Sequence, residues 1–150
     1  MRLAATAAAL VVALAFSAPA SAVLILQRGM AGIRLGMTQA KVRAKLGKPR
    51  SVVHGSNDFG NYTELHYRRL RITFQGNSTV TAIWTGSPGQ RTRRGIGVGS
   101  TVRAVRVRVP DVRCTRGHCY LGRFLPGRRV TEFFLRKGRV SAIAVGFVID

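Results

Sequence analysis

The segment Cys114-Thr-Arg-Gly-His-Cys119 places the chain's two thiols beside an imidazole. Thiolates and imidazoles bind zinc, but structural zinc sites usually show four ligands in tighter spacings such as C-x2-C. The other two histidines, His54 and His66, lie far away in the sequence. In an oxidising compartment, two nearby thiols form a disulfide more readily than a metal site. We therefore expect a Cys114–Cys119 disulfide that pins a turn, with a metal site as the alternative, and no cofactor.

The other reactive side chains form no catalytic pattern. Gly95-Ile-Gly-Val-Gly99 lacks the G-x-G-x-x-G spacing of a dinucleotide loop, so we interpret it as a turn. No G-x-S-x-G nucleophile elbow is present, and the histidines lack an H-x3-H spacing. The five acidic residues are scattered: Asp58, Glu64, Asp111, Glu132 and Asp150. The sequence therefore predicts a protein that is not an enzyme, and a small secreted hydrolase remains an alternative.

Basic residues far outnumber acidic ones, with 25 Lys+Arg against 5 Asp+Glu and a formal net charge of +20. Such an imbalance produces a positive potential over much of the surface. Outside a cell, suitable anions are wall polymers bearing phosphate, anionic lipid headgroups, acidic proteins and stray nucleic acid. No nucleic-acid-binding motif is present, so sequence-specific nucleic-acid binding is not expected. The candidate anion-binding residues are Arg91, Arg93, Arg94, Arg103 and Arg106.

A second candidate surface combines aromatic and basic side chains. Trp84 is the chain's single tryptophan, and side-chain alternation predicts that it faces away from the core together with Phe134. Arg71 and Arg136 would flank them on the same side of a sheet. This mixture is typical of the centres of protein–protein interfaces. The alternative is that a loop covers both aromatic rings.

The amino terminus has the features of a cleavable signal peptide. Met1-Arg2 supplies a positive charge, residues 3–16 form an apolar run, and Ala20-Ser-Ala22 matches a cleavage site. The run is too short for a membrane span, which needs about 20 residues. We therefore predict a signal peptide at 1–22 and one secreted or extracytoplasmic domain at 23–150, with no transmembrane segment in the mature chain.

Two stretches of the chain resemble each other. Gly32-Ile-Arg-Leu-Gly-Met-Thr38 matches Gly95-Ile-Gly-Val-Gly-Ser-Thr101, and Val80-Thr-Ala-Ile83 matches Val140-Ser-Ala-Ile143. The order and spacing are nearly kept, which indicates a tandem repeat of about 60 residues. We place the two repeats at about 32–86 and 95–149, joined by a polar Gly/Pro stretch.

Local signals predict short helices and antiparallel strands in each repeat. Thr38 is a good N-cap for a helix over 39–46, which Gly47 and Pro49 would end. Thr101 would cap a second helix, although Val105-Arg-Val107-Arg-Val109 also alternates like a strand, so residues 102–109 remain helix or strand. Strands are expected at 61–67, 70–74, 80–85, 120–124, 130–135 and 140–149.

These elements predict an α+β fold of tandem helix-plus-antiparallel-sheet repeats in a single domain. Three strands and one helix would occur twice, and the strands would form one antiparallel sheet with the helices on one face.

The string from Gly32 to Thr38, followed by Val42, Leu46, Gly47 and Pro49, resembles the SmpA/OmlA family. These are small lipoproteins of the outer-membrane barrel-assembly machinery. The chain is also similar to the secreted β-lactamase inhibitor proteins, which carry two tandem helix-plus-sheet units. The resemblance implies a non-enzymatic protein that works through protein–protein contact.

These observations lead to one expected function and two alternatives. We expect a secreted, non-catalytic binding protein that acts by protein–protein contact, in the cell envelope or as an inhibitor. The first alternative is a structural protein of the cell wall that binds an anionic envelope polymer. The second alternative is the small secreted hydrolase.

Overall fold

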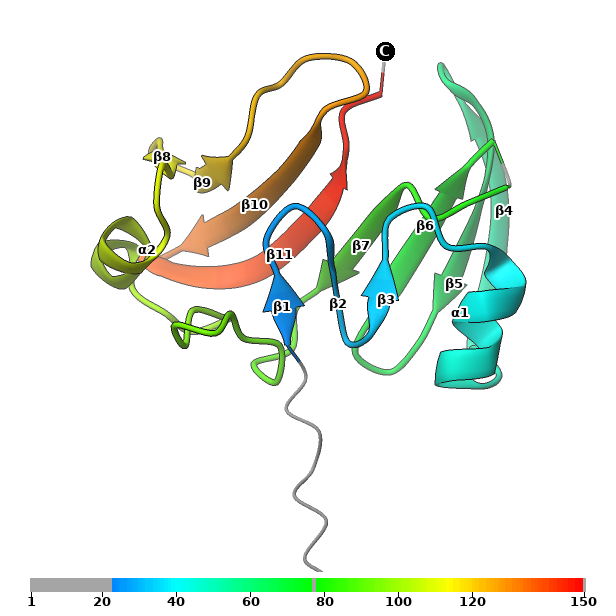
Figure 1. Cartoon of the computed structure of the whole chain (residues 1–150), viewed down its shortest axis with the longest axis horizontal. Helices are drawn as coiled ribbons and strands as arrows, with labels where there is room; N and C mark the ends of the chain where they lie inside the picture. Colours follow the sequence, from blue (N-terminus) through cyan, green and yellow to red (C-terminus); the bar gives the residue numbers. More distant parts are fainter. Residues whose placement is uncertain (1–22, 77, 150) are drawn as a thin grey trace, which may run out of the picture.

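The computed structural model describes residues 23–76 and 78–149 (Figure 1). The predicted signal peptide at 1–22 lies outside the described residues. Within the described part of the chain, no helix is long and apolar enough to cross a membrane.

β-Strands are the main secondary structure of the described chain, and they form a small sheet and a large sheet, both antiparallel. The small sheet contains β1 (Leu24–Ile25), β2 (Gly29–Met30) and β3 (Ile33–Arg34). The large sheet contains β4 (Ser51–Asn57), β5 (Gly60–His66), β6 (Arg71–Gln75), β7 (Ala82–Thr85), β8 (Arg113–Cys114), β9 (His118–Leu121), β10 (Arg129–Arg136) and β11 (Arg139–Phe147). Its strand order is β4-β5-β6-β7-β11-β10-β9-β8, so β7 and β11, the last strands of the two halves in chain order, pair at the centre.

Two short helices, α1 (Gln39–Leu46) and α2 (Val102–Arg108), precede the two halves of the large sheet. The Lys41 N–H donates to Thr38 Oγ1 at 3.4 Å, and the Ala104 N–H donates to Thr101 Oγ1 at 3.2 Å. Both predicted N-caps are thus confirmed. The ambiguous segment at 102–109 is helical up to Arg108, with an extended Val109 as its C-cap, because the Thr101 cap satisfies a free N–H and because Val105 is buried.

One continuous core lies on one face of the large sheet. The sheet contributes alternating residues such as Phe74, Ile83 and Phe133, which are fully buried. Val42 of α1 and Val105 of α2 belong to the same core, and so do three residues of the small sheet: Leu24, Met30 and Ile33. Figure 1 shows the small sheet lying across the large one. The helices and the small sheet therefore cover the inner face and leave the outer face open.

The predicted α+β fold class is wrong. Strands account for 46% of the structure and helices for only 12%. Both helices end early because Gly47 adopts a φ of 77° and because Pro49 and Pro110 cannot continue a helix. The chain therefore forms a wide β-sheet covered by two helices of 8 and 7 residues, not a helix-plus-sheet repeat.

The two matching strings of the sequence occupy similar places. The Gly36 N–H donates to the Val80 carbonyl at 2.8 Å, and the Gly99 N–H donates to the Val140 carbonyl at 2.7 Å. Each string thus leads into a helix while it hydrogen-bonds to the start of a central β-segment. The matching residues set these turns, but the strands that follow merge into a single sheet.

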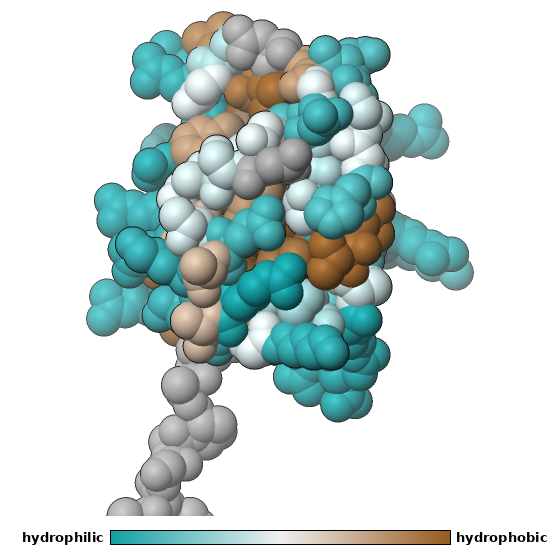
Figure 2. Space-filling view, turned by 90° about the vertical axis from the view of Figure 1, so that its right-hand side faces the viewer, coloured by the Kyte–Doolittle hydropathy of each residue, from teal (hydrophilic) through white to brown (hydrophobic). Residues whose placement is uncertain are grey.

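Strand β4 forms one exposed edge of the large sheet. It is paired on one side only, with β5, and all but one of its residues are exposed. Val53 keeps 39% of its surface accessible. Figure 2 faces the side of the molecule that carries α1 and β4, and it shows apolar patches between hydrophilic side chains. Because β4 has unpaired backbone groups and apolar side chains, this edge is available for strand pairing.

Candidate functional site

The outer face of the large sheet carries a row of polar and aromatic side chains. Residues that are paired in register across antiparallel strands point to the same side. The row crosses seven strands through His66, Arg71, Trp84, Ala144, Glu132, Tyr120 and Arg113. Their neighbours along each strand, such as Ile72 and Ile83, are buried in the core. The row therefore lies on the face opposite the helices.

Arg71 and Trp84 are in contact on this face. The Arg71 guanidinium carbon lies 5.0 Å from the centroid of the Trp84 ring, which is within the range of a cation–π contact. Arg71 Nε lies 3.9 Å from Glu64 Oε1, and Thr73 donates to the same oxygen at 3.2 Å. Glu64 Oε2 lies 2.9 Å from His66 Nε2. Glu64 thus helps to hold the guanidinium over the indole ring.

A depression of about 410 Å³ lies beside the Arg71–Trp84 pair. Its lining includes His66, Tyr67, Arg68, Arg69, Leu70, Arg71, Trp84, Gly86 and Ser87. A partner's side chain that entered this depression would lie beside Trp84 and three arginines.

The second predicted aromatic residue, Phe134, lies on β10, beyond the intervening strand β11. Its register partner is Ala142, while that of Trp84 is Ala144, so both rings project from the outer face as expected. Strands β7 and β10 are separated by two strand spacings, about 10 Å. Phe134 is 36% exposed, so no loop covers it. Small side chains on β11 therefore separate two aromatic positions.

Further aromatic residues extend the surface beyond Phe134. Tyr120 lies 5.6 Å from His118 and 5.0 Å from Phe124, measured between ring centroids. Sequence reasoning did not single out Tyr120, Glu64 or His66 for this site. Only the pairing of the strands brings these residues onto one face of the sheet, and strand pairing is a long-range property.

Arg136 does not join the other predicted interface residues. It pairs with Arg139 at the end of the β10–β11 hairpin, after an irregularity in the register at Phe134/Leu135. The structure therefore brings Arg71 and Trp84 into contact, and it places Phe134 on the same face and Arg136 at the end of a hairpin.

The five predicted anion-binding arginines do not converge on one site. Arg91 donates to the carbonyls of Gly95 and Val98, so its guanidinium group stabilises its own loop. Arg94 donates to the Arg108 carbonyl at 3.4 Å, and Arg93 lies beside it in the segment before α2. Arg103 and Arg106 lie exposed on α2. The predicted anion-binding arginines therefore lie in two places, on the loop before α2 and on the exposed surface of α2.

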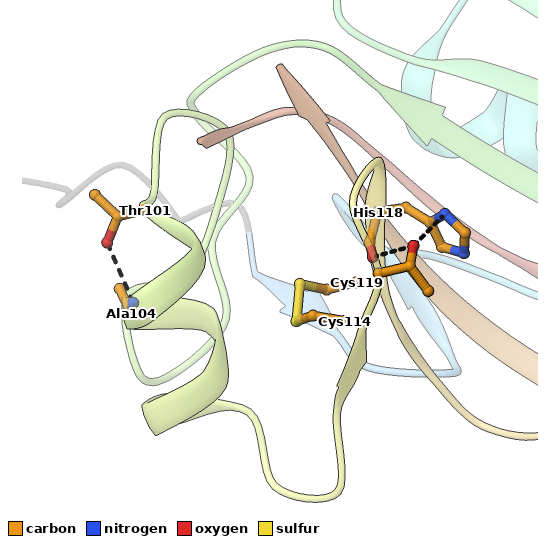
Figure 3. The surroundings of a disulfide bond; sticks show 6 residues. Thr101, Ala104, Cys114, His118 and Cys119 are labelled. Carbon is orange, nitrogen blue, oxygen red and sulfur yellow. Dashed lines mark hydrogen bonds between the residues drawn. A yellow bond between two sulfur atoms is a disulfide. The ribbon is translucent and has the colours of Figure 1, made fainter. Parts of the chain in front are cut away.

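The predicted disulfide is confirmed. Cys114 and Cys119 are bonded at 2.02 Å and face each other across the β8–β9 pair (Figure 3). The alternative in which these thiols hold a metal with His118 is therefore wrong. His118 instead has its Nδ1 atom 3.3 Å from Thr115 Oγ1. Disulfides are typical of proteins in oxidising compartments, which supports an extracytoplasmic location.

No family model and no curated protein matches the chain. Among solved structures, the chain is similar to an extracellular protein containing a SCP domain from Bacillus anthracis str. Ames, with 10% identity and a TM-score of 0.54. The match covers 75% of this chain but only 44% of that protein, so it shows the fold alone. A DUF4309 family protein (YjgB) from Bacillus subtilis subsp. subtilis str. 168 has 17% identity and a TM-score of 0.41, over 73% of this chain and 78% of the other. The fold is thus similar to part of an extracellular protein.

Proposed function

We propose that this protein is an exported, non-catalytic binding protein that docks a protein partner on the outer face of its large sheet. The observation that carries the proposal is the Arg71–Trp84 pair, held by Glu64 beside an open depression. Tryptophan and arginine are the residue types most enriched among the residues that dominate interface energetics. The signal-peptide pattern at 1–22 would deliver the chain to a partner outside the cytoplasm.

Preorganisation favours this face over the rest of the surface. Binding usually costs side-chain entropy, because exposed arginine and aromatic side chains lose rotamers when a partner covers them. Arg71 is already positioned by Trp84 and Glu64, so less freedom remains to be lost. The small residues on β11, Ala142 and Ala144, leave room for a partner to reach both Trp84 and Phe134.

The hydrolase alternative finds little support in the described residues. A hydroxyl nucleophile needs an adjacent imidazole base that is itself oriented by a carboxylate. Across residues 23–76 and 78–149, the imidazole that forms an ion pair with a carboxylate is that of His66, and its partner is Glu64. The hydroxyl of Thr73 donates a hydrogen bond to Glu64 and not to the imidazole of His66. His54 contacts Thr63, but that threonine is buried away from any substrate.

The test compares capture by matched variants. The purified protein, immobilised, is exposed to an envelope extract of the source organism, and retained proteins are identified and their affinities then measured individually. We expect one partner to bind wild type and Phe59→Ala, which removes an aromatic ring that is 49% exposed at the tip of the β4–β5 hairpin. Trp84→Ala should weaken the same partner at least about tenfold, as expected for a residue at an interface centre.

Salt distinguishes this proposal from polyanion binding. Contacts centred on aromatic rings should survive washing at high salt, whereas contacts with an anionic polymer are screened. Equal retention by Trp84→Ala and Phe59→Ala, or loss of all retained material at high salt, would refute the proposed face.

A further inference from the structure

A second pocket lies on the other side of the molecule, between the β1–β2 turn and the β9–β10 loop. It has a volume of about 540 Å³ and shares no residue with the Trp84 depression. Four of its lining residues are arginines. The lining includes Leu26, Gln27, Arg28, Gly122, Arg123, Gly127, Arg128 and Arg129.

Gln27, in the β1–β2 turn, hydrogen-bonds to β10 on the other side of this pocket. It adopts a φ of 58°, and its backbone N–H donates to Thr131 Oγ1 at 2.7 Å. Its side-chain Nε2 donates to the Arg129 carbonyl at 2.8 Å. Gly122 packs so tightly there, with a φ of 110°, that an added Cβ would lie 2.6 Å from the Arg129 carbonyl oxygen. These contacts join the β1–β2 turn to the start of β10 at Arg129.

The charge of this pocket is not balanced by the protein. Among the described residues, the salt bridges are those of Glu64, on the opposite face of the sheet. Guanidinium groups elsewhere, such as those of Arg91 and Arg139, donate to backbone carbonyls. In the pocket, the guanidinium carbon of Arg129 lies 5.5 Å from the Phe147 ring centroid, which orients this group without neutralising it. An anion that binds at this pocket would neutralise part of the charge of its four arginines.

We infer that this arginine pocket binds a compact ligand that carries two or more phosphate groups. Guanidinium groups match phosphate oxygens with paired, charge-assisted hydrogen bonds, and several arginines around one cavity are suited to several such groups. A long polymer would follow an extended basic groove, whereas these four arginines line a single open depression formed by a turn and a loop. The ligand therefore enters as a small molecule or as a terminal group.

Titration calorimetry of the purified protein with tripolyphosphate, pyrophosphate and inorganic phosphate tests this inference. We expect affinity to increase in the order phosphate, pyrophosphate, tripolyphosphate, and to decrease as salt increases. The double variant Arg123→Gln/Arg128→Gln should bind tripolyphosphate roughly tenfold or more weakly, because each lost guanidinium removes charge-assisted hydrogen bonds. Both residues are exposed, so circular dichroism should show an unchanged fold.

The matched control is Arg103→Gln/Arg106→Gln, which removes the same charge from exposed positions on α2. This control should lose less than about threefold in affinity for tripolyphosphate, because it changes only the long-range electrostatic attraction and not the pocket. Equal losses in the two double variants would show a general attraction to the basic surface and would overturn the pocket. Equal affinity for tripolyphosphate and a disulfated ligand would overturn the assignment of phosphate. Trp84→Ala should keep tripolyphosphate binding, so the two proposals can fail separately.

Discussion

At the scale of single residues, Tyr67 links the loop after β5 to the end of helix α1. Its hydroxyl donates to the Gly47 carbonyl at 3.1 Å, and Gly47 is the C-cap of the helix. Burial raises the pKa of Tyr67 above its usual value of 10.0, and the positive charge of Arg43 opposes this shift to a smaller extent. The structure therefore favours the protonated phenol, which can donate this hydrogen bond.

This preference makes stability depend on pH in the alkaline range. Because the pKa is higher in the folded than in the unfolded chain, the contribution is fully present below pH 10 and is lost as pH rises through the folded value. Tyr67→Phe should cost about 1 kcal/mol at neutral pH, the usual worth of one hydrogen bond. The variant should also lose less stability than wild type between pH 9 and about 11. Urea unfolding across this range measures both effects, and parallel pH profiles would contradict the assignment.

Residue-scale predictions succeeded where the interaction is local. The caps at Thr38 and Thr101 and the Cys114–Cys119 disulfide each join residues no more than five positions apart. Glu64 and His66 were not predicted as site residues. Their importance comes from the pairing of β5 with β6, which sequence periodicity does not specify.

At the scale of elements, strands were predicted best where apolar residues alternate with polar ones. Strands β6, β10 and β11 lie close to their expected positions. Strand β4 was missed because Ser51–Asn57 has exposed side chains on both faces and therefore lacks the alternation of a half-buried strand. The small sheet was missed because its strands have only two residues each. These omissions explain why helices received too much weight in the expected fold.

The exposed edge formed by β4 has a testable consequence for association. It has no lysine, arginine or proline to block pairing with another chain, and Val53 is exposed. Two copies repel each other because of their net charge, and salt screens this repulsion. We therefore expect self-association of the protein to increase with salt, and Val53→Lys to suppress it.

Analytical ultracentrifugation at increasing salt measures this association. Val107→Lys is the matched control, since it adds the same charge at a valine on α2 that is 72% exposed. If Val53→Lys and Val107→Lys reduce association equally, then net charge and not the β4 edge controls it.

At the scale of the whole molecule, the positive charge is unevenly distributed. Residues 51–90 contain three of the 25 basic residues and two of the five acidic ones, whereas residues 91–139 contain 14 basic residues and two acidic ones. The strand order places these two parts of the sequence in different halves of the large sheet. Strands β4 to β7 form one half of the large sheet, and β8 to β11 form the other. The segment that forms β4 to β7 is thus nearly neutral, whereas the segment that forms α2 and β8 to β11 is strongly basic.

The single tryptophan allows the two proposed sites to be followed independently in the intact protein. Trp84 lies on the outer face of the large sheet. Gln27 of the arginine pocket hydrogen-bonds to Thr131, whose buried side chain points to the inner face. Tripolyphosphate should therefore leave the emission maximum of Trp84 and its quenching by acrylamide unchanged, even at saturation in calorimetry. A protein partner on the outer face should shift the emission and protect the ring. If tripolyphosphate changes Trp84 emission, and still does so in Arg123→Gln/Arg128→Gln, then the anion binds at the arginines beside Trp84 and the two sites are one.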